Sequence, residues 1–364
     1  MAVTTDQLSQ ALAAVTDPNT GKDFVSTRAL RNLTVSDGGD VAFDIELGYP
    51  AKSQFTALRS LLVAAAKAVP GVANVSVSIS SNIVAHAAQR GVALLPNIKN
   101  IVAVASGKGG VGKSTTAVNL ALALAAEGAK VGLLDADIYG PSQPMMMGIE
   151  GRPESSDGKT MDPLKNYGVE VMSIGFLVNQ DEAMIWRGPM ATQALDQLLR
   201  QTNWSGLDYL IVDLPPGTGD IQLTLAQRVP LTGAVIVTTP QDIALLDAKK
   251  GIKMFEKVGV PILGIVENMA VHVCSNCGHV EHIFGEGGGK KMAAQYGMDY
   301  LGALPLDIAI RVQADSGKPT VVADPEGEVA GIYKALARQV AIKIAAKAKD
   351  FSSKFPSITI SKDT

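Results

Sequence analysis

The sequence predicts an α/β protein with a mostly parallel sheet covered by helices on both faces, preceded by a small α+β domain. Two observations carry this prediction. From residue 101 onward, short apolar runs alternate with helical patterns, as in a sheet whose crossover helices cover both faces. Before about residue 95, the order is helix, strand, strand, helix, strand. The candidate strands of the larger part are 101–106, 131–135, 169–174, 209–213, 234–238, 262–267 and 300–303.

The first 80 residues carry their own set of short elements. A length of about 80 residues is enough for a domain that folds alone. Asp17-Pro18 ends the first helix, and Asp37-Gly-Gly39 is a turn of the kind that joins two strands. The expected elements are helices at 6–15 and 55–68 and strands at 25–35, 41–48 and 72–79. We therefore expect an α+β domain at 1–80, a linker at 81–98, the larger domain at 99–350 and a flexible tail at 351–364.

Composition excludes several classes of protein. The chain has 364 residues, 47% of them hydrophobic, and a formal net charge of −3, which gives no general attraction to nucleic acid or to an anionic membrane. The first residues lack the basic and apolar regions of a signal peptide, and no apolar run is long enough to cross a bilayer. We expect a soluble, cytoplasmic protein. Its two cysteines lie close together and form no disulfide framework.

The most informative segment is 104–115, which reads Val-Ala-Ser-Gly-Lys-Gly-Gly-Val-Gly-Lys-Ser-Thr. It fits the phosphate-loop pattern G-x-x-x-x-G-K-[ST] and lies between an apolar strand and an alanine-rich helix. At such a junction, backbone N–H groups and the helix dipole favour a bound phosphate. The pattern therefore predicts a P-loop NTPase. The expected nucleotide-binding residues are Gly107, Lys108, Gly109, Gly110, Val111, Gly112, Lys113, Ser114 and Thr115.

Three side chains of this loop carry the expected chemistry. Lys113 is predicted to reach the β- and γ-phosphates, and Ser114 is predicted to bind Mg²⁺. Lys108 is a second lysine that an ordinary phosphate loop does not need. Its presence indicates that two copies of the chain cooperate at the nucleotide.

Three acidic residues follow predicted strands, where ligands of parallel sheets bind. Asp213 ends the apolar run Tyr-Leu-Ile-Val and fits the Mg²⁺-holding acid of a P-loop site, as does Asp135 at the end of its own strand. Asp137 is a candidate to orient the attacking water. The plainer explanations are turn aspartates at strand ends for Asp135 and Asp213 and a solvated loop acid for Asp137.

Several strings make a family resemblance specific. The loop from Gly107 to Thr115 resembles the deviant Walker A loop of the dimeric ATPases that include the nitrogenase iron protein, septum-site ATPases and plasmid-partition ATPases. Five further strings extend this resemblance, so that the chain from about 99 to about 345 resembles Mrp/ApbC-type iron–sulfur cluster carrier ATPases. The N-terminal part resembles the small domain of iron–sulfur assembly proteins. The further strings are DADIYGPS at 135–142, WRGPM at 186–190, DLPPGTGD at 213–220, VENM at 266–269 and CSNC at 274–277.

The resemblance implies roles for individual residues. In this family, the lysine that corresponds to Lys108 reaches the nucleotide of the other subunit, so ATP would lie between two copies of a homodimer. The position of Asn268 implies a contact with the adenine base. The family also implies a labile [4Fe-4S] cluster that bridges two subunits and is passed to apo iron–sulfur proteins.

The pair Cys274 and Cys277 allows four interpretations. A redox dithiol lacks the expected thioredoxin-like context. A zinc site would take Cys274, Cys277, His279 and His282 from only nine residues, and two unliganded thiols are a third reading. The fourth combines two cysteines from each of two subunits, because an iron–sulfur cluster takes four thiolates and one chain has two. The resemblance favours the fourth, with Zn²⁺ as the alternative metal.

Other functional classes remain open on the sequence alone. They are a membrane- or DNA-associated partitioning ATPase, an electron-transfer reductase and a zinc-stabilised nucleotide-binding scaffold. The amphipathic segment 329–348 is expected to pack on the sheet, although septum-site ATPases use such a helix to bind membrane. The glycine-rich segment 285–291 is expected to be a turn that leads into a helix.

Overall fold

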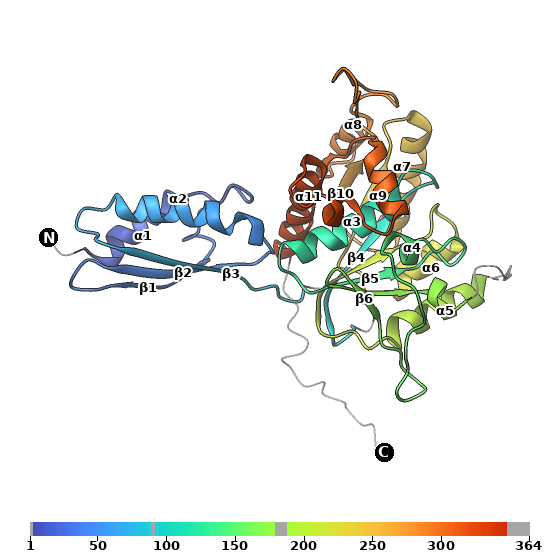
Figure 1. Cartoon of the computed structure of the whole chain (residues 1–364), viewed down its shortest axis with the longest axis horizontal. Coiled ribbons are helices and arrows are strands. Elements are labelled where there is room, and N and C mark those ends of the chain that lie inside the picture. Colours follow the sequence, from blue (N-terminus) through green and yellow to red (C-terminus); the bar gives the residue numbers. More distant parts are fainter. Residues whose placement is uncertain (1–2, 87, 89–91, 93, 179–187, 348–364) are drawn as a thin grey trace, which may run out of the picture.

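The computed structural model describes residues 3–86, 88, 92, 94–178 and 188–347 of the chain (Figure 1). The predicted tail at 351–364 and two residues of the WRGPM string, Trp186 and Arg187, lie outside the described residues. The chain forms an N-terminal unit, residues 3–81, and a larger C-terminal unit, residues 98–347, each built around its own sheet. Figure 1 shows the two units side by side, with α11 next to the N-terminal unit.

The N-terminal unit has two helices on a three-stranded sheet in the order β1-β2-β3. β1 and β2 are antiparallel, and β2 and β3 are parallel. A capping box at Thr4 and Gln7 begins the first helix, and alternating burial along β2 directs Phe43 and Ile45 into the core. The elements are α1 (Thr5–Ala13), β1 (Leu30–Val35), β2 (Val41–Leu47), η1 (Lys52–Gln54), α2 (Phe55–Lys67) and β3 (Val75–Ser81).

The predicted order of elements in this unit is confirmed, but the first strand is shorter than expected. We predicted a strand from residue 25, whereas β1 begins at Leu30. The carboxylate of Asp23 accepts hydrogen bonds from the N–H groups of Val25 and Ser26, at 2.9 and 2.6 Å. These bonds hold the backbone in turns, because a side-chain acceptor competes with strand pairing.

The C-terminal unit contains an eight-stranded sheet in the order β13-β10-β9-β4-β8-β5-β7-β6. All neighbouring strands are parallel except the antiparallel pair β6 and β7, so the predicted mostly parallel α/β sheet is confirmed. The sequence prediction missed the three-residue edge strand β6. The strands are β4 (Ile98–Ala105), β5 (Val131–Asp135), β6 (Leu164–Asn166), β7 (Val169–Ser173), β8 (Leu207–Asp213), β9 (Gly233–Thr238), β10 (Ile262–Glu267) and β13 (Tyr300–Ala303).

Helices cover both faces of this sheet and create two cores. Alternate residues of β4 enter different cores: Val102 and Val104 pack with α3 and α11, and Ile101 and Ala103 pack with α5, α6 and α7. The helices are α3 (Lys113–Ala126), α4 (Gln143–Met146), η2 (Ile174–Phe176), α5 (Gly188–Arg200), α6 (Asp220–Arg228), α7 (Asp242–Lys257), α8 (Gly288–Gln295), α9 (Ile308–Asp315), α10 (Thr320–Ala323) and α11 (Glu328–Ala345).

The last helix, α11, is packed within the C-terminal unit. Its buried face, which includes Tyr333, Leu336 and Val340, lies against α3 and the strands β10 and β13. This arrangement agrees with the expected packing of segment 329–348. Within the described residues, no helix is both long and apolar enough to cross a membrane.

The two units meet at the carboxyl end of α3. Glu127 directly follows this helix and is 1% exposed. Its carboxylate accepts hydrogen bonds from the hydroxyl and the N–H of Ser53 in the N-terminal unit and from the guanidinium of Arg338 in α11, at 2.6, 2.9 and 2.5 Å. The N–H of Lys52 donates to the carbonyl oxygen of Glu127 at 3.1 Å. The N-terminal unit is therefore bonded to the far end of the helix that begins at the phosphate loop.

Candidate functional site

The predicted phosphate loop lies between β4 and the N-terminus of α3. Gly110 and Gly112 have φ of +80°, a left-handed conformation that side-chain-bearing residues rarely adopt. Gly107 approaches α7 so closely that a Cβ atom there would lie 2.1 Å from the backbone carbon of Asp247. The glycines are therefore required by backbone conformation and by close packing. The free N–H groups of the first turn of α3 begin at Lys113.

The ammonium group of Lys113 lies between two predicted site residues. Its Nζ is 2.5 Å from Oδ1 of Asp213 and 3.1 Å from Oγ of Ser114. Asp213 is fully buried and Lys113 is 6% exposed, so this ion pair is shielded from water. The structure thus brings together the lysine, hydroxyl and carboxylate that the sequence assigned to phosphate and Mg²⁺.

Asp135 is fully buried beside them at the end of β5, the strand next to β8. Its oxygens accept hydrogen bonds from the N–H groups of Asp137, Ser142 and Gln143, at 3.2, 3.0 and 3.0 Å. The Ser173 hydroxyl donates a further bond at 3.1 Å. Burial, and then the negative charge of Asp213, raise the pKa of Asp135 to about 7. Two buried carboxylates at the ends of neighbouring strands suit a site that receives a divalent cation.

Asp137 lies two residues further along and is half-buried. Burial raises the pKa of its carboxyl group, and the positive charge of Lys113 acts in the opposite direction. Asp137 lines a cavity of about 450 Å³ with Pro215 and Pro216, from the turn that follows β8. The N–H of Gly217 in that turn donates to the carbonyl oxygen of Ser106 at 3.0 Å, which holds the turn against the phosphate loop.

Sequence reasoning missed Gln143, which is fully buried at the start of α4. Its Nε2 donates to Oδ2 of Asp213 at 2.8 Å and to the carbonyl oxygen of Ser114 at 3.1 Å. Its own N–H donates to Asp135. Gln143 therefore connects the three residues assigned to Mg²⁺. The available signal was a glutamine just before the apolar run Pro-Met-Met-Met, in the loop that follows the Asp-x-Asp string.

Asn268 lies behind the phosphate loop and is 7% exposed. Its Nδ2 donates to the carbonyl oxygen of Val111 at 2.8 Å. A Cβ atom on Gly112 would lie 2.1 Å from the same nitrogen, so the asparagine and the loop are in close contact. Asn268 thus supports the loop backbone, and its expected contact with adenine stays a prediction.

Lys108 lies at the exposed side of the loop and is half-buried. The hydroxyl of Ser106 donates to its carbonyl oxygen at 2.8 Å and fixes the backbone at this point. Its ammonium makes no ion pair in the part of the chain that the structure describes. Segment 285–291 leads into α8, as expected, and the Glu267 carboxylate accepts the N–H groups of Gly289 and Lys290.

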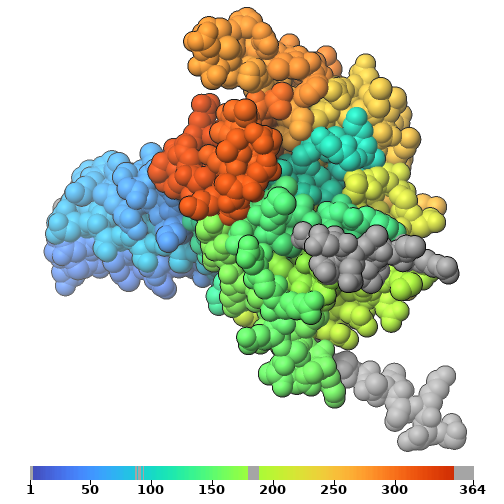
Figure 2. All heavy atoms as spheres, turned by 45° about the vertical axis from the view of Figure 1, so that its right-hand side comes forward, coloured from blue at the N-terminus to red at the C-terminus, as the bar shows by residue number. Residues whose placement is uncertain are grey.

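The two cysteines lie on an exposed β-hairpin that the sequence prediction missed. Its strands are β11 (His272–Val273) and β12 (Val280–Glu281), and the turn between them carries both thiols. The N–H of Cys274 donates to the carbonyl oxygen of His279 at 2.9 Å. The N–H of Gly278 donates to the carbonyl oxygen of Cys274 at 2.8 Å. Cys277 is exposed. The hairpin projects from the top of the molecule in Figures 1 and 2 (orange).

The turn also changes the chemistry of the first thiol. The N–H groups of Asn276 and then Cys277 bond to the sulfur of Cys274 and lower the pKa of its thiol. Within the described residues, no group of three or more His, Cys, Asp or Glu side chains is placed to hold a metal ion. Nδ1 of His282 lies 2.9 Å from the carbonyl oxygen of Ala270 instead. One chain therefore presents a two-thiol site at this hairpin.

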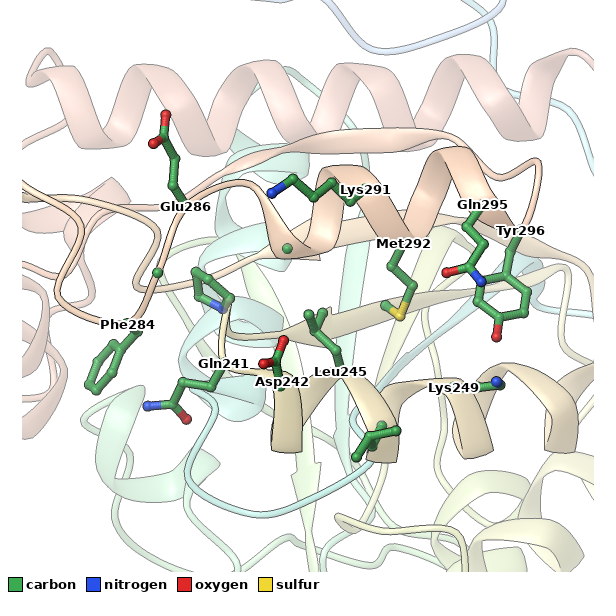
Figure 3. Close-up of a pocket in the computed structure, with 14 residues that line it drawn as sticks. Gln241, Asp242, Leu245, Lys249, Phe284, Glu286, Lys291, Met292, Gln295 and Tyr296 are labelled. Carbon is green, nitrogen blue, oxygen red and sulfur yellow. The ribbon is translucent and has the colours of Figure 1, made fainter.

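A second cavity, of about 580 Å³, lies between α7 and α8 and contains none of the predicted site residues. Figure 3 shows Leu245 and Met292 at its centre, with Lys249 near Tyr296 at one end and Phe284 at the other. This cavity is thus separate from the phosphate loop.

Comparisons with known proteins agree with this geometry. A family model described as the NUBPL iron-transfer P-loop NTPase matches residues 97–341. A second model, described as an iron–sulfur cluster assembly protein, matches residues 5–79. The matched segments correspond to the two units of the structure.

Individual relatives share most of the chain. The iron–sulfur cluster carrier protein of Escherichia coli strain K12 is 53% identical over 336 residues, 92% of this chain and 90% of the relative. The protein of the same name from Pseudomonas fragi is 64% identical over 269 residues, 73% of this chain and 94% of the relative. A solved nucleotide-binding protein from Archaeoglobus fulgidus, in complex with ADP and with cobalt found in it, has a TM-score of 0.56 and 40% identity. The match covers 64% of this chain and 90% of the A. fulgidus chain.

Proposed function

Because the chain belongs to the NUBPL-type iron-transfer P-loop NTPases, we propose that it is an ATP-hydrolysing carrier of iron–sulfur clusters. In this proposal two copies hold one labile [4Fe-4S] cluster between them and pass it to apo-proteins. The names of its relatives from E. coli and P. fragi support the cluster as cargo. We further propose functional domains at 1–80 and 99–350, joined by a linker at 81–98.

The exposed hairpin with two thiols is the observation that carries this proposal. A [4Fe-4S] cluster takes four cysteine thiolates, and the chain has only Cys274 and Cys277. Two hairpins related by a two-fold axis would supply the four ligands. The lowered pKa of the Cys274 thiol favours the thiolate, which is the form that binds iron. An exposed site with two ligands per chain also suits release of the cluster by thiol exchange.

The nucleotide half of the proposal assigns roles around the phosphate loop. Lys113 and the loop N–H groups would bind the phosphates, and Ser114, Asp213 and Asp135 would hold Mg²⁺ directly or through water. Asp137 would orient the attacking water. Lys108 would reach the ATP of the partner copy and stabilise the charge that develops during phosphoryl transfer.

The segment after β10 offers a path between the two sites. It begins at Asn268, which bonds to the phosphate loop at Val111, and reaches Cys274 six residues later. Between them, Leu306 bonds to the carbonyl oxygen of Val271, and His272 Nδ1 lies 2.9 Å from the carbonyl oxygen of Leu306. A shift of the loop on nucleotide binding would be transmitted along this bonded segment to the hairpin.

Anaerobic reconstitution with iron and sulfide tests the cargo. We expect about four irons per two chains, visible-range cluster absorption and transfer of the cluster to an apo-ferredoxin. Cys274→Ser and Cys277→Ser should each abolish loading. Ser275→Ala, in the same exposed turn, is the matched control and should load normally. Full iron loading by either cysteine variant would contradict the proposal, and so would binding of zinc alone by the wild-type chain.

A further inference from the structure

Gln222 is a buried side chain that packing does not explain. It lies in the first turn of α6 and is 2% exposed. Neither Nε2 nor Oε1 of its amide has a hydrogen-bond partner among the described residues. Buried amides are nearly always paired, because an unpaired polar group gives up its bonds to water without replacing them. A methionine of similar length would fill the same space without this cost.

The position of Gln222 relates it to the nucleotide site. It lines the cavity of about 450 Å³ that Asp137 also lines. Asp137 follows β5 and Gln222 follows β8, and these neighbouring parallel strands end at the same edge of the sheet. The turn between β8 and α6 is held to the phosphate loop by the bond from Gly217 to Ser106.

The charges around the cavity indicate what it would bind. Its charged lining side chains, among the described residues, are the carboxylates of Asp137 and Asp220, with no lysine or arginine. An anion such as a phosphate group is disfavoured next to two carboxylates. A neutral water molecule is favoured, since it can donate hydrogen bonds to a carboxylate and to an amide oxygen.

We propose that Gln222 orients the attacking water of ATP hydrolysis together with Asp137, an inference that rests on the proposed function. The water donates one hydrogen bond to Asp137 and one to Oε1 of Gln222, which leaves a lone pair directed at the γ-phosphorus. The water oxygen bonds to that phosphorus as the bond to the β,γ-bridging oxygen breaks. One water proton passes to Asp137 and then to the released phosphate. In other P-loop enzymes, a glutamine also orients the attacking water.

The substitution Gln222→Met separates this role from packing. It keeps the length of the side chain and removes an unpaired amide, so the melting temperature should be unchanged or higher. The turnover number should fall at least about tenfold, while the dissociation constant for a non-hydrolysable ATP analogue stays within about twofold. Gln227→Met is the matched control, because Gln227 is an exposed residue of the same helix, and its kinetics should equal those of the wild type.

The outcomes distinguish this inference from the proposed function. If the wild-type chain hydrolyses ATP and Gln222→Met hydrolyses it equally well, the proposed role of Gln222 is wrong. The proposed ATPase activity is then still supported. If both variants and the wild type bind ATP without hydrolysis, the proposed ATPase and the role of Gln222 fail together. A drop in turnover accompanied by an equal loss of analogue affinity would assign Gln222 to binding and would also overturn the inference.

Discussion

Ser53 and Glu127, 74 positions apart, are joined by two hydrogen bonds that connect the N-terminal unit to the C-terminal unit. The carboxylate of Glu127 is buried at the C-terminus of α3, where the helix dipole disfavours a negative charge. Arg338 supplies the compensating positive charge at 2.5 Å. The fourteen residues of α3 span about 21 Å between this contact and the phosphate loop.

Replacement of Ser53 by alanine should weaken the contact between the units. It removes a hydroxyl that donates to a buried carboxylate, a loss of about 1–3 kcal/mol in the free energy of unfolding. Denaturant unfolding of the full chain measures the change. Ser60→Ala removes an exposed hydroxyl of the same unit, which donates to the carbonyl oxygen of Thr56, and should be nearly neutral. Equal effects of the two substitutions would contradict the role of Ser53.

Removal of the Lys108 side chain should abolish ATP turnover and leave nucleotide binding largely intact. The reason is that Lys108 would stabilise charge in the partner's transition state, whereas Lys113 would bind the phosphates of the nucleotide in its own chain. Steady-state hydrolysis and equilibrium binding of a fluorescent ATP analogue measure the two properties for Lys108→Ala. Lys67→Ala, on α2, is the control. Normal turnover by Lys108→Ala would exclude a role in trans.

Replacement of Gln143 by methionine should weaken Mg²⁺ binding more than nucleotide binding. Asp213 would lose the hydrogen bond that fixes its Oδ2, whereas the bonds to Asp135 come from backbone N–H groups and Ser173 and would remain. We expect about a tenfold higher Mg²⁺ requirement for hydrolysis, comparable to other losses of residues that orient metal ligands. Met145→Ala, an exposed position of the same short helix, provides the control. If Gln143→Met needs the same Mg²⁺ concentration for hydrolysis as the wild type, Gln143 does not contribute to Mg²⁺ binding.

The pKa of Asp135 predicts a pH dependence of stability. The pKa of about 7 in the folded chain lies above the ordinary aspartate value of 3.8, so the folded chain binds more protons than the unfolded chain between these values. The contribution of Asp135 to the free energy of unfolding therefore decreases as pH rises from about 4 to about 7. Urea unfolding of wild type and Asp135→Asn over this range isolates the contribution. The difference between the two should change in this window and be constant above it.

Cys274 should react faster than Cys277 with iodoacetamide in the reduced, iron-free protein near neutral pH. Hydrogen bonds from the N–H groups of Asn276 and Cys277 stabilise the Cys274 thiolate, which is the reactive form. Mass spectrometry of peptides after brief alkylation gives the two rates. In urea the turn is lost, and the rates should become equal. Faster labelling of Cys277 in the folded chain would contradict the geometry of the turn.

Local patterns predicted the phosphate loop and most buried strands, because their signals lie in contiguous residues. β5, β10 and β13 have the predicted bounds, and the glycines of the loop have the conformations that their motif requires. Pattern reasoning missed the three residues of β6 and the two-residue strands β11 and β12, which are too short to show alternation.

Tertiary contacts account for the remaining differences. Gln143 acquires its position only when the ends of β5 and β8 meet, so its place before an apolar run does not by itself reveal the bond to Asp213. Gln222 is similar, since its burial without a partner depends on the fold of α6 against the sheet. Asp23 shortened the predicted first strand through hydrogen bonds to the next turn, a competition that residue propensities do not resolve.

The division of cluster ligands into two thiols per hairpin would have a genetic consequence. If four thiolates must come from two chains, a chain that lacks one cysteine but still dimerises would disable the intact chain that it pairs with. In a mixed population, the share of fully competent dimers would fall as the square of the intact fraction. A cysteine substitution would then be dominant over the wild-type copy, whereas a substitution that prevents folding would be recessive.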